Sequence, residues 1–169
     1  MSVQNYSETP FAKFDRLEKG EGERCLRVGY LNEEKVSQLF RRNGWNVTCH
    51  NDKGDYGLGY DITIEKDGII AHVEIKHQSG RVGNKVYPTF FCETHHAGGG
   101  QSGWTKPDSD CTHFVITNEY EGKVYIFNAK QLREKLMDST VRETQYAGCQ
   151  GKLIGWCDRT AGLTKVVSL

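Results

Sequence analysis

The sequence predicts a single α/β domain with a central mixed β-sheet flanked by helices. Apolar residues recur at helical spacing in residues 33–43 and 129–137, while six stretches between them have the β-branched, alternating pattern of strands. The chain of 169 residues is 37% hydrophobic and 11% aromatic, which is enough for one ordinary core and argues against disorder. Helices at both ends of a run of strands favour an α/β sheet protein.

The first helix is expected over residues 33–43. Asn32 is a suitable N-cap, and Gly44 is a suitable stop. The expected core-facing side chains are Val36, Leu39 and Phe40. Residues 1–24 are expected to form a separate polar segment, either with a short helix or as a loosely ordered tail, which leaves residues 25–169 as the domain.

The strands follow in order along the chain. Residues 60–64 and 69–76 alternate and flank an Asp-Gly turn at Asp67-Gly68, which predicts a hairpin. The other expected strands are residues 45–50, 86–93, 112–117 and 123–127. The second helix, residues 129–137, is expected to present its apolar face through Leu132, Leu136 and Met137. For residues 138–169 only a strand-like end at 163–169 is expected.

The hairpin brings charged groups together. Glu74 and Lys76 share one face of their strand because side chains repeat every two residues, and Asp61 lies on the partner strand. Two neighbouring carboxylates repel each other unless a cation lies between them. Mg²⁺ suits one or two carboxylates plus water, and the Ile75 carbonyl would supply a further oxygen.

Asp61 followed by Glu74-Ile75-Lys76 resembles the core of the PD-(D/E)XK nuclease superfamily, in which a Glu on a preceding helix is also typical. The resemblance implies a restriction-endonuclease-like fold, with Asp61 and Glu74 binding Mg²⁺, or Mn²⁺ as a substitute. Lys76 would hold or deprotonate the attacking water, or offset charge on the phosphate. By its distance from Gly44, Glu33 matches the helix acid of the archaeal-resolvase pattern better than the adjacent Glu34 does.

The resemblance continues downstream with a strand that carries Glu93, a Ser102-Gly103-Trp104 segment and an acid, Asp110, before another strand. It departs at Tyr60, where Pro is usual before the first catalytic acid. Activity is accordingly expected to be metal-dependent hydrolysis of DNA phosphodiesters. A resolvase-like or phage-type enzyme that selects DNA structure and acts as a homodimer is favoured, and a sequence-specific restriction-type enzyme is the alternative.

Contacts to the DNA are expected from side chains near the site and in two Gly-rich loops. The candidates are Gln78, Arg81, Lys85, Trp104 and Lys106. Cations suit phosphate, and an indole ring can stack on a base. Trp104 packed in the core is the alternative for that residue.

Two other classes of function stay open. With 22 basic and 22 acidic residues, the chain lacks the positive excess of most nucleic-acid binders, which argues against a nuclease. A non-catalytic DNA- or protein-binding module that keeps the same fold is one alternative. A small zinc protein using His95, His96 and nearby cysteines is another, although no two of the six cysteines have zinc-ribbon spacing. No apolar run approaches the roughly 20 residues of a membrane span. We therefore expect a cytoplasmic protein with reduced thiols and no membrane contact.

Overall fold

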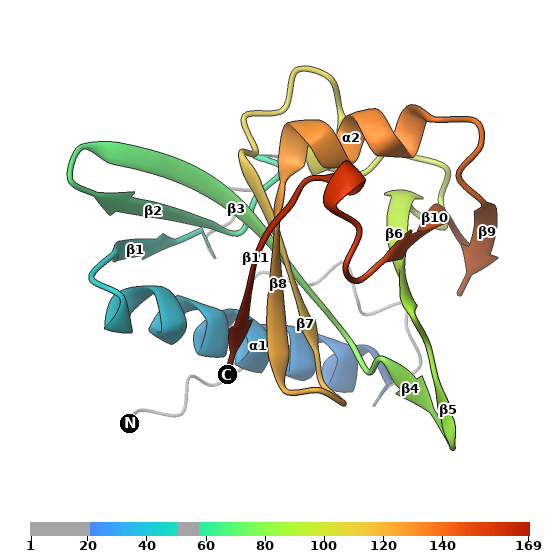
Figure 1. Cartoon of the computed structure of the whole chain (residues 1–169), viewed down its shortest axis with the longest axis horizontal. Coiled ribbons are helices and arrows are strands. Elements are labelled where there is room, and N and C mark those ends of the chain that lie inside the picture. The colour runs from blue at the N-terminus through green and yellow to red at the C-terminus, as the bar shows by residue number, and fades with distance from the viewer. Residues whose placement is uncertain (1–20, 51–57) are drawn as a thin grey trace.

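A computed structural model describes residues 21–50 and 58–169 of the chain, with side chains from residue 28 onward. Six strands form the central sheet, in the order β1-β2-β3-β7-β8-β11 (Figure 1). Their bounds are β1 Asn46–Cys49, β2 Ile62–Lys66, β3 Ile69–Gln78, β7 His113–Asn118, β8 Lys123–Asn128 and β11 Leu163–Ser168. Neighbours are antiparallel except β3 and β7, which are parallel. The expectation of a mixed central sheet is confirmed.

A second, three-stranded sheet was not expected. It has the order β6-β10-β9 and consists of β6 Thr89–His95, β9 Glu143–Tyr146 and β10 Cys149–Gly155. The expectation that residues 86–93 add a strand to the central sheet is therefore wrong. Residues 85–86 belong instead to a small arm, the hairpin of β4 Arg81–Val82 and β5 Lys85–Val86, which projects from the body of the molecule (Figure 1).

The first helix, α1 Glu21–Arg42, begins well before the expected start at residue 33. Asn32 does not cap it. The Asn32 side chain is buried within the helix and its amide donates to the Lys76 carbonyl over 3.2 Å, which ties α1 to β3. Residues 21–31 contain no proline to interrupt the helix. The expected division after residue 24 falls inside α1, and the expected short helix lies in residues 1–20, outside the described residues.

Local chemistry places the other elements where they were expected. Asp67 and Gly68 have φ values of 52° and 78°, which close the β2–β3 hairpin with Lys66 opposite Ile69. The second helix is α2 Ala129–Met137, and the Asn128 side chain caps it by accepting from the Gln131 N–H. Its apolar face is shorter than expected, because Leu132 and Leu136 are buried whereas Met137 is 81% exposed.

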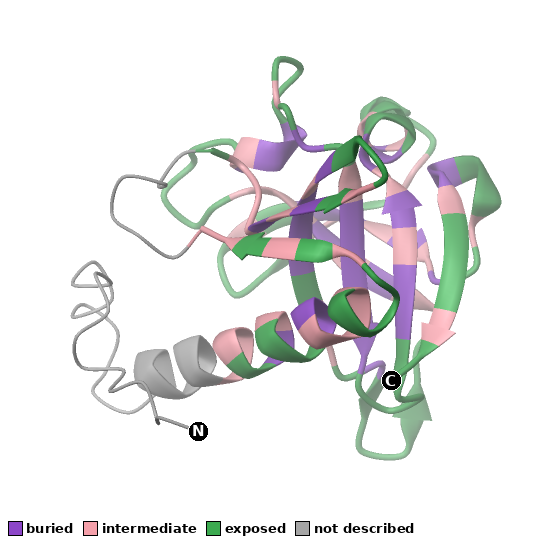
Figure 2. Cartoon of the chain, turned by 90° about the vertical axis from the view of Figure 1, so that its left-hand side faces the viewer, coloured by how far each residue is buried: buried purple, intermediate pink, exposed green. Residues whose placement is uncertain are grey.

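The two faces of the central sheet carry different cores. Under α1 the packing is mainly aliphatic, with Val36 fully buried and Leu39 and Phe40 partly buried, as expected. On the other face the second sheet and α2 cover a largely aromatic cluster that includes Phe90, Phe114 and Phe127. Figure 2 shows the buried positions concentrated on the strands in the middle of the sheet. In the described part of the chain, no helix is long and apolar enough to cross a membrane.

Candidate active site

Asp61 is fixed by the backbone on both sides of Glu74. Its N–H donates to the Val73 carbonyl over 2.9 Å, and its carboxylate Oδ2 accepts from the Ile75 N–H over 2.7 Å. The side chain thereby occupies a hydrogen-bonding position at the end of β2 that a backbone carbonyl would otherwise take. This arrangement brings the Asp61 carboxylate beside Glu74 without depending on a flexible loop.

Glu74 and Lys76 lie on the same face of β3, as their spacing predicted. The Glu74 side chain is only 10% exposed, and its Oε1 lies 2.7 Å from the Lys76 Nζ. The Lys76 side chain is 49% exposed, so it lies between the buried carboxylate and solvent. The pair is a charge-assisted hydrogen bond, which is shorter and stronger than a neutral one.

α1 supplies a third carboxylate, and the structure distinguishes the two candidates. Glu34 is exposed, accepts from the Gln38 amide and lies near Arg41, on the solvent side of the helix. Glu33 is half-buried and interacts electrostatically with Asp61, Lys76 and Glu74. Glu33 is therefore the helix acid that belongs to the cluster.

Burial and mutual repulsion disfavour ionisation of these carboxyl groups. Burial and the neighbouring Asp61 raise the pKa of Glu74 to about 7, although Lys76 opposes the shift. Burial, followed by Asp61, raises the pKa of Glu33 to about 8. Burial also raises the pKa of Asp61, against the opposing effects of Lys76 and the Ile75 N–H. Several carboxyl groups held at a cost in one place are typical of a functional site.

The pKa of Lys76 is also raised, but for an amine this favours the charged form. Desolvation disfavours its charge, yet the Glu74 and Asp61 carboxylates outweigh that effect and raise the pKa of Lys76 above its usual value. The side chain is therefore an ammonium at neutral pH. Of the roles expected for Lys76, stabilising negative charge fits this state, whereas deprotonating water does not.

Glu74 and Lys76 face a pocket of about 260 Å³ between the central sheet and the second sheet, here called the carboxylate pocket. Its lining residues are Gly59, Glu74, Lys76, His77, Gln78, Phe91, Glu93, His96, Ser102, Gly103, Trp104 and Phe114. Gly59 makes one wall possible, because it has a φ of 77° and any Cβ on it would lie 2.9 Å from the Gly103 carbonyl carbon. Asp61 and Glu33 lie next to Glu74 and Lys76 but are not in the lining.

The donor set suits a hard cation. Asp61 and Glu74 offer carboxylate oxygens that repel each other, and a divalent ion between them would relieve the repulsion. Among the described residues, no group of three or more His, Cys, Asp or Glu side chains could hold a metal ion. Two carboxylates are within the usual number for Mg²⁺, which fills its remaining positions with water and phosphate oxygens. The Ile75 N–H is bonded to Asp61, and the Ile75 carbonyl as a further ligand remains a prediction.

A zinc site at His95, His96 and nearby cysteines lacks support, because the described residues contain no cluster of three or more suitable ligands. His95 pairs with the Thr94 hydroxyl, and His96 pairs with Glu93. Cys92 and Cys111 are buried, and desolvation raises the pKa of the Cys111 thiol to about 12. A buried thiol of this kind does not readily become the thiolate that zinc binds.

Two expected DNA contacts have other partners in the structure. Gln78 exchanges two hydrogen bonds with the Phe91 backbone, of 2.5 Å and 2.9 Å, and so joins the central sheet to the second sheet. Trp104 is 2% exposed and packs on Phe114 with ring centroids 4.6 Å apart. Its burial favours the alternative, Trp104 packed in the core, and stacking of the indole on a base stays an untested prediction.

The expected cations are placed differently. Lys106, two residues beyond Trp104, is exposed, as are Arg81 and Lys85 on the β4–β5 arm. The Arg81 guanidinium lies over the Tyr120 ring at 4.7 Å, and the Lys85 Nζ lies 5.0 Å from the Tyr87 ring. Both charged groups remain in contact with solvent, where they are accessible to phosphate.

Sequence reasoning did not include Glu93 and His96 among the site residues, although both line the carboxylate pocket. Glu93 is on β6 and accepts a hydrogen bond of 3.0 Å from the Ser102 hydroxyl. The signal that could have identified it was the strand acid followed by the Ser102-Gly103-Trp104 segment. That pattern indicated a resemblance but not which side chains face the site.

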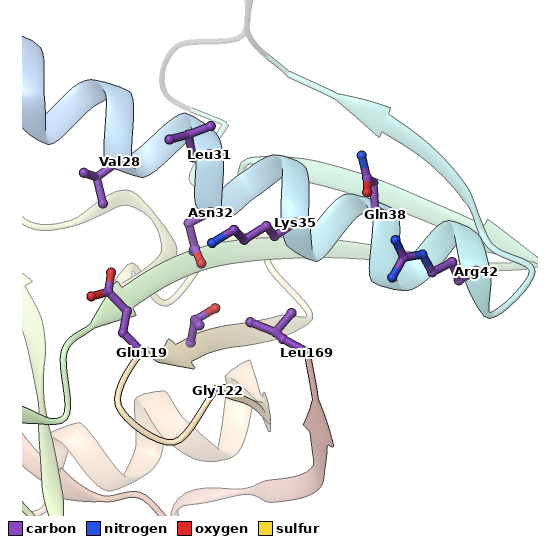
Figure 3. Close-up of a pocket in the computed structure, with 10 residues that line it drawn as sticks. Val28, Leu31, Asn32, Lys35, Gln38, Arg42, Glu119, Gly122 and Leu169 are labelled. Atoms are coloured by element: carbon purple, nitrogen blue, oxygen red, sulfur yellow. The ribbon is translucent and has the colours of Figure 1, made fainter. Parts of the chain in front are cut away.

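A larger groove of about 660 Å³ lies between α1 and the end of β11 (Figure 3). Lys35 and Arg42 line its α1 side, while Glu119 and Leu169 lie opposite. It contains none of the clustered carboxylates. Two of its residues contact the site: Asn32 bonds the Lys76 backbone, and the Glu119 Oε1 lies 3.8 Å from the Nε2 of His77, which lines the carboxylate pocket.

Comparisons with known proteins add little. No protein-family model and no curated protein matches the sequence. Among solved structures, the chain is similar to a bacterial homing endonuclease, I-Ssp6803I, with a TM-score of 0.45 and 16% sequence identity. The match covers 71% of this chain and 80% of that chain. Because so slight a likeness does not establish an activity, the function must follow from the site itself.

Proposed function

We propose that this protein is a metal-dependent DNA endonuclease that hydrolyses phosphodiester bonds at the Asp61, Glu74 and Lys76 site. The supporting observation is that Asp61 is bonded to the backbone on both sides of Glu74, which places two carboxylates beside an ammonium at a pocket wall. Such a grouping destabilises a metal-free protein at neutral pH, and a bound divalent cation would relieve the repulsion between the carboxylates.

Each residue has a separate role in this proposal. Asp61 and Glu74 would hold Mg²⁺, with Mn²⁺ as a substitute, and the Ile75 carbonyl would assist. The bound ion would polarise the phosphate and lower the pKa of an attacking water. Lys76 would stabilise the negative charge that develops on the phosphate, and Glu33 would orient the water from α1.

DNA is the proposed substrate because exposed cations occur in the segments that follow Lys76 along the chain. Arg81, Lys85 and Lys106 suit contacts to phosphate, which position a duplex but carry no sequence information. We therefore favour selection by DNA structure, as the resolvase-like position of Glu33 also suggests. The homodimer and the cytoplasmic location remain predictions.

Cleavage of a small DNA panel tests this function. Linear duplex, single strand, flap and four-way junction would each be incubated with Mg²⁺, Mn²⁺ or EDTA. We expect metal-dependent cutting by the parent chain that is lost in Asp61→Asn and Glu74→Ala. Glu65→Ala is the matched control, because Glu65 is an exposed carboxylate on the same hairpin. Cutting by Glu74→Ala at the parent rate would disprove the site, and binding of DNA with no cutting would favour a non-catalytic module.

A further inference from the structure

A carboxylate–histidine pair faces the carboxylate pocket from the second sheet. The His96 Nδ1 lies 2.6 Å from the Glu93 Oε1, and the same oxygen accepts the Ser102 hydroxyl over 3.0 Å. Glu93 is thus held from two directions. Its bond to Nδ1 fixes the imidazole orientation and directs the other ring nitrogen, Nε2, away from the carboxylate.

His96 has a defined position despite its exposed ring. Its N–H donates to the Gly100 carbonyl and its carbonyl accepts from the Gly99 N–H, both over 2.8 Å. On either side of this turn, His95 and Gln101 pair in a β-bridge. The imidazole therefore extends from a closed turn. Within the described part of the chain, Nε2 has no hydrogen-bond partner.

The pair lines the same pocket as the proposed metal ligand Glu74, but from different elements. Glu74 and Lys76 line it from β3, whereas Glu93 and His96 line it from β6 and the following turn. Glu93 is close enough to Glu74 that, after burial and Asp61, it also contributes to the raised pKa of Glu74. A phosphodiester in this pocket would meet both the Lys76 ammonium and the His96 imidazole in its lining.

We propose that His96 is a catalytic residue, the general acid that protonates the leaving oxygen, and that Glu93 is its positioning residue. The inference rests on the proposed nuclease function. A water oxygen forms the new bond to phosphorus as the bond from phosphorus to the leaving oxygen breaks. The leaving oxygen takes the proton from His96 Nε2, and the proton of the attacking water passes to solvent. The imidazolium is then restored by a proton from solvent.

A sulfur-substituted substrate isolates this role. A thiolate leaves without being protonated, so replacing the leaving oxygen of one scissile phosphodiester by sulfur removes the need for an acid. Product ends from the ordinary substrate first identify which bridging oxygen leaves. Single-turnover cleavage of matched oxygen and sulfur substrates is then measured for the parent, His96→Ala and the control His95→Ala, whose imidazole is bonded to Thr94 outside the pocket.

We expect His96→Ala to cut the oxygen substrate about 100-fold more slowly, within the usual range for general acid catalysis, and the sulfur substrate at nearly the parent rate. His95→Ala should behave as the parent on both. Glu93→Gln should show the same preference for sulfur, more weakly, because the imidazole remains but loses its orienting charge. A purely structural role for Glu93 would slow both substrates alike.

The inference and the function fail differently. If the parent cuts neither substrate with metal present, the nuclease function is wrong. If the parent cuts both and His96→Ala slows neither, or slows both by the same factor, the site is a nuclease but His96 is not the acid.

Discussion

The two groups of charges in this molecule lie in contrasting surroundings. At β3, the carboxylates of Asp61 and Glu74 are held against Lys76 in a largely buried site, where Lys76 opposes the raised pKa of each carboxyl group and both carboxylates raise the pKa of Lys76. On the β4–β5 arm, Arg81 and Lys85 are exposed, and neither has an ion-pair partner among the described residues. Charges interact strongly where water is excluded and weakly where it is not.

The contrast shows that position, more than the number of charges, determines what they do. The chain has no net charge, yet it concentrates repulsion at one place and leaves cations free at another. We therefore expect changes in the buried regions to have large effects on stability or catalysis, and changes on the arm to have small, salt-dependent effects on binding.

The largest expected effect concerns Trp104, the buried neighbour of exposed Lys106. Trp104→Ala should lower the free energy of unfolding by about 3–5 kcal/mol, because it leaves a cavity beside Phe114. Trp104→Phe should retain most of the stability and the cleavage rate, and Lys106→Ala should leave stability unchanged. Urea denaturation measures all three. A stable Trp104→Ala that only weakens DNA binding would mean that the indole stacks on a base instead.

Lys76 tests the catalytic consequence of the buried cluster. Lys76→Ala should reduce the cleavage rate roughly 10²- to 10³-fold, because it removes a preorganised charge next to the reacting phosphate. Lys76→Arg should recover part of the loss, since it keeps the charge but not the geometry. Single-turnover kinetics at saturating Mg²⁺ provide the comparison, with exposed Lys123→Ala as the control. Equal rates for Lys76→Ala and the parent would remove Lys76 from the mechanism.

The raised carboxyl pKa values predict an unusual dependence of stability on pH. Glu33 and Glu74 bind protons more tightly in the folded chain, with pKa values of about 8 and about 7 against a usual 4.5. Their protonated forms stabilise the fold fully below about pH 4.5, and that contribution is lost as the pH rises through 7 and 8. In EDTA, the free energy of unfolding should therefore fall between pH 5 and pH 8, and Mg²⁺ should reduce the fall.

Glu74→Gln sharpens the same test, because an amide mimics the protonated acid. At pH 8 in EDTA we expect the variant to be roughly 1–3 kcal/mol more stable than the parent, and inactive with Mg²⁺. Glu65→Gln, on the exposed side of the hairpin, should change neither property. Loss of stability in Glu74→Gln would show that the carboxylate is stabilised by Lys76 more than it is destabilised by Asp61.

The smallest effects are expected on the arm. Arg81→Ala and Lys85→Ala should each weaken duplex binding by less than about 1 kcal/mol near physiological salt. Each lost phosphate contact should reduce the slope of log K against log salt by about 1. Fluorescence anisotropy at several salt concentrations measures both quantities, with exposed Lys165→Ala as a control distant in sequence. An unchanged salt slope for both arm variants would show that the arm does not contact DNA.

Features set by neighbouring residues could be predicted from the sequence. Asp67-Gly68 determines the hairpin that brings Asp61 to Glu74, and the period of two places Lys76 on the same face as Glu74. Asn128 caps α2 through the adjacent turn. In each case the determining contact lies within a few residues along the chain or across one hairpin.

Features that depend on distant partners could not be predicted. β6 pairs with β10, whose residues lie far along the chain in a region that reads as turns. The residues around Trp104 have the composition of a Gly-rich loop. Only the contact with Phe114 and the surrounding aromatic cluster in the folded chain shows that Trp104 belongs to the core. The start of α1 at Glu21 was missed because Asn32 resembles a cap, whereas its side chain bonds to β3.

The parallel pairing of β3 with β7 has a further consequence for how such a protein could diversify. Parallel neighbours need a long crossover connection, and here residues 79–112 supply it. That one segment carries the arm, β6, and the turn with His96, while Asp61, Glu74 and Lys76 lie before it. Exchanging the crossover would therefore replace the arm, β6 and the turn together and leave the β2–β3 hairpin with its carboxylates in place.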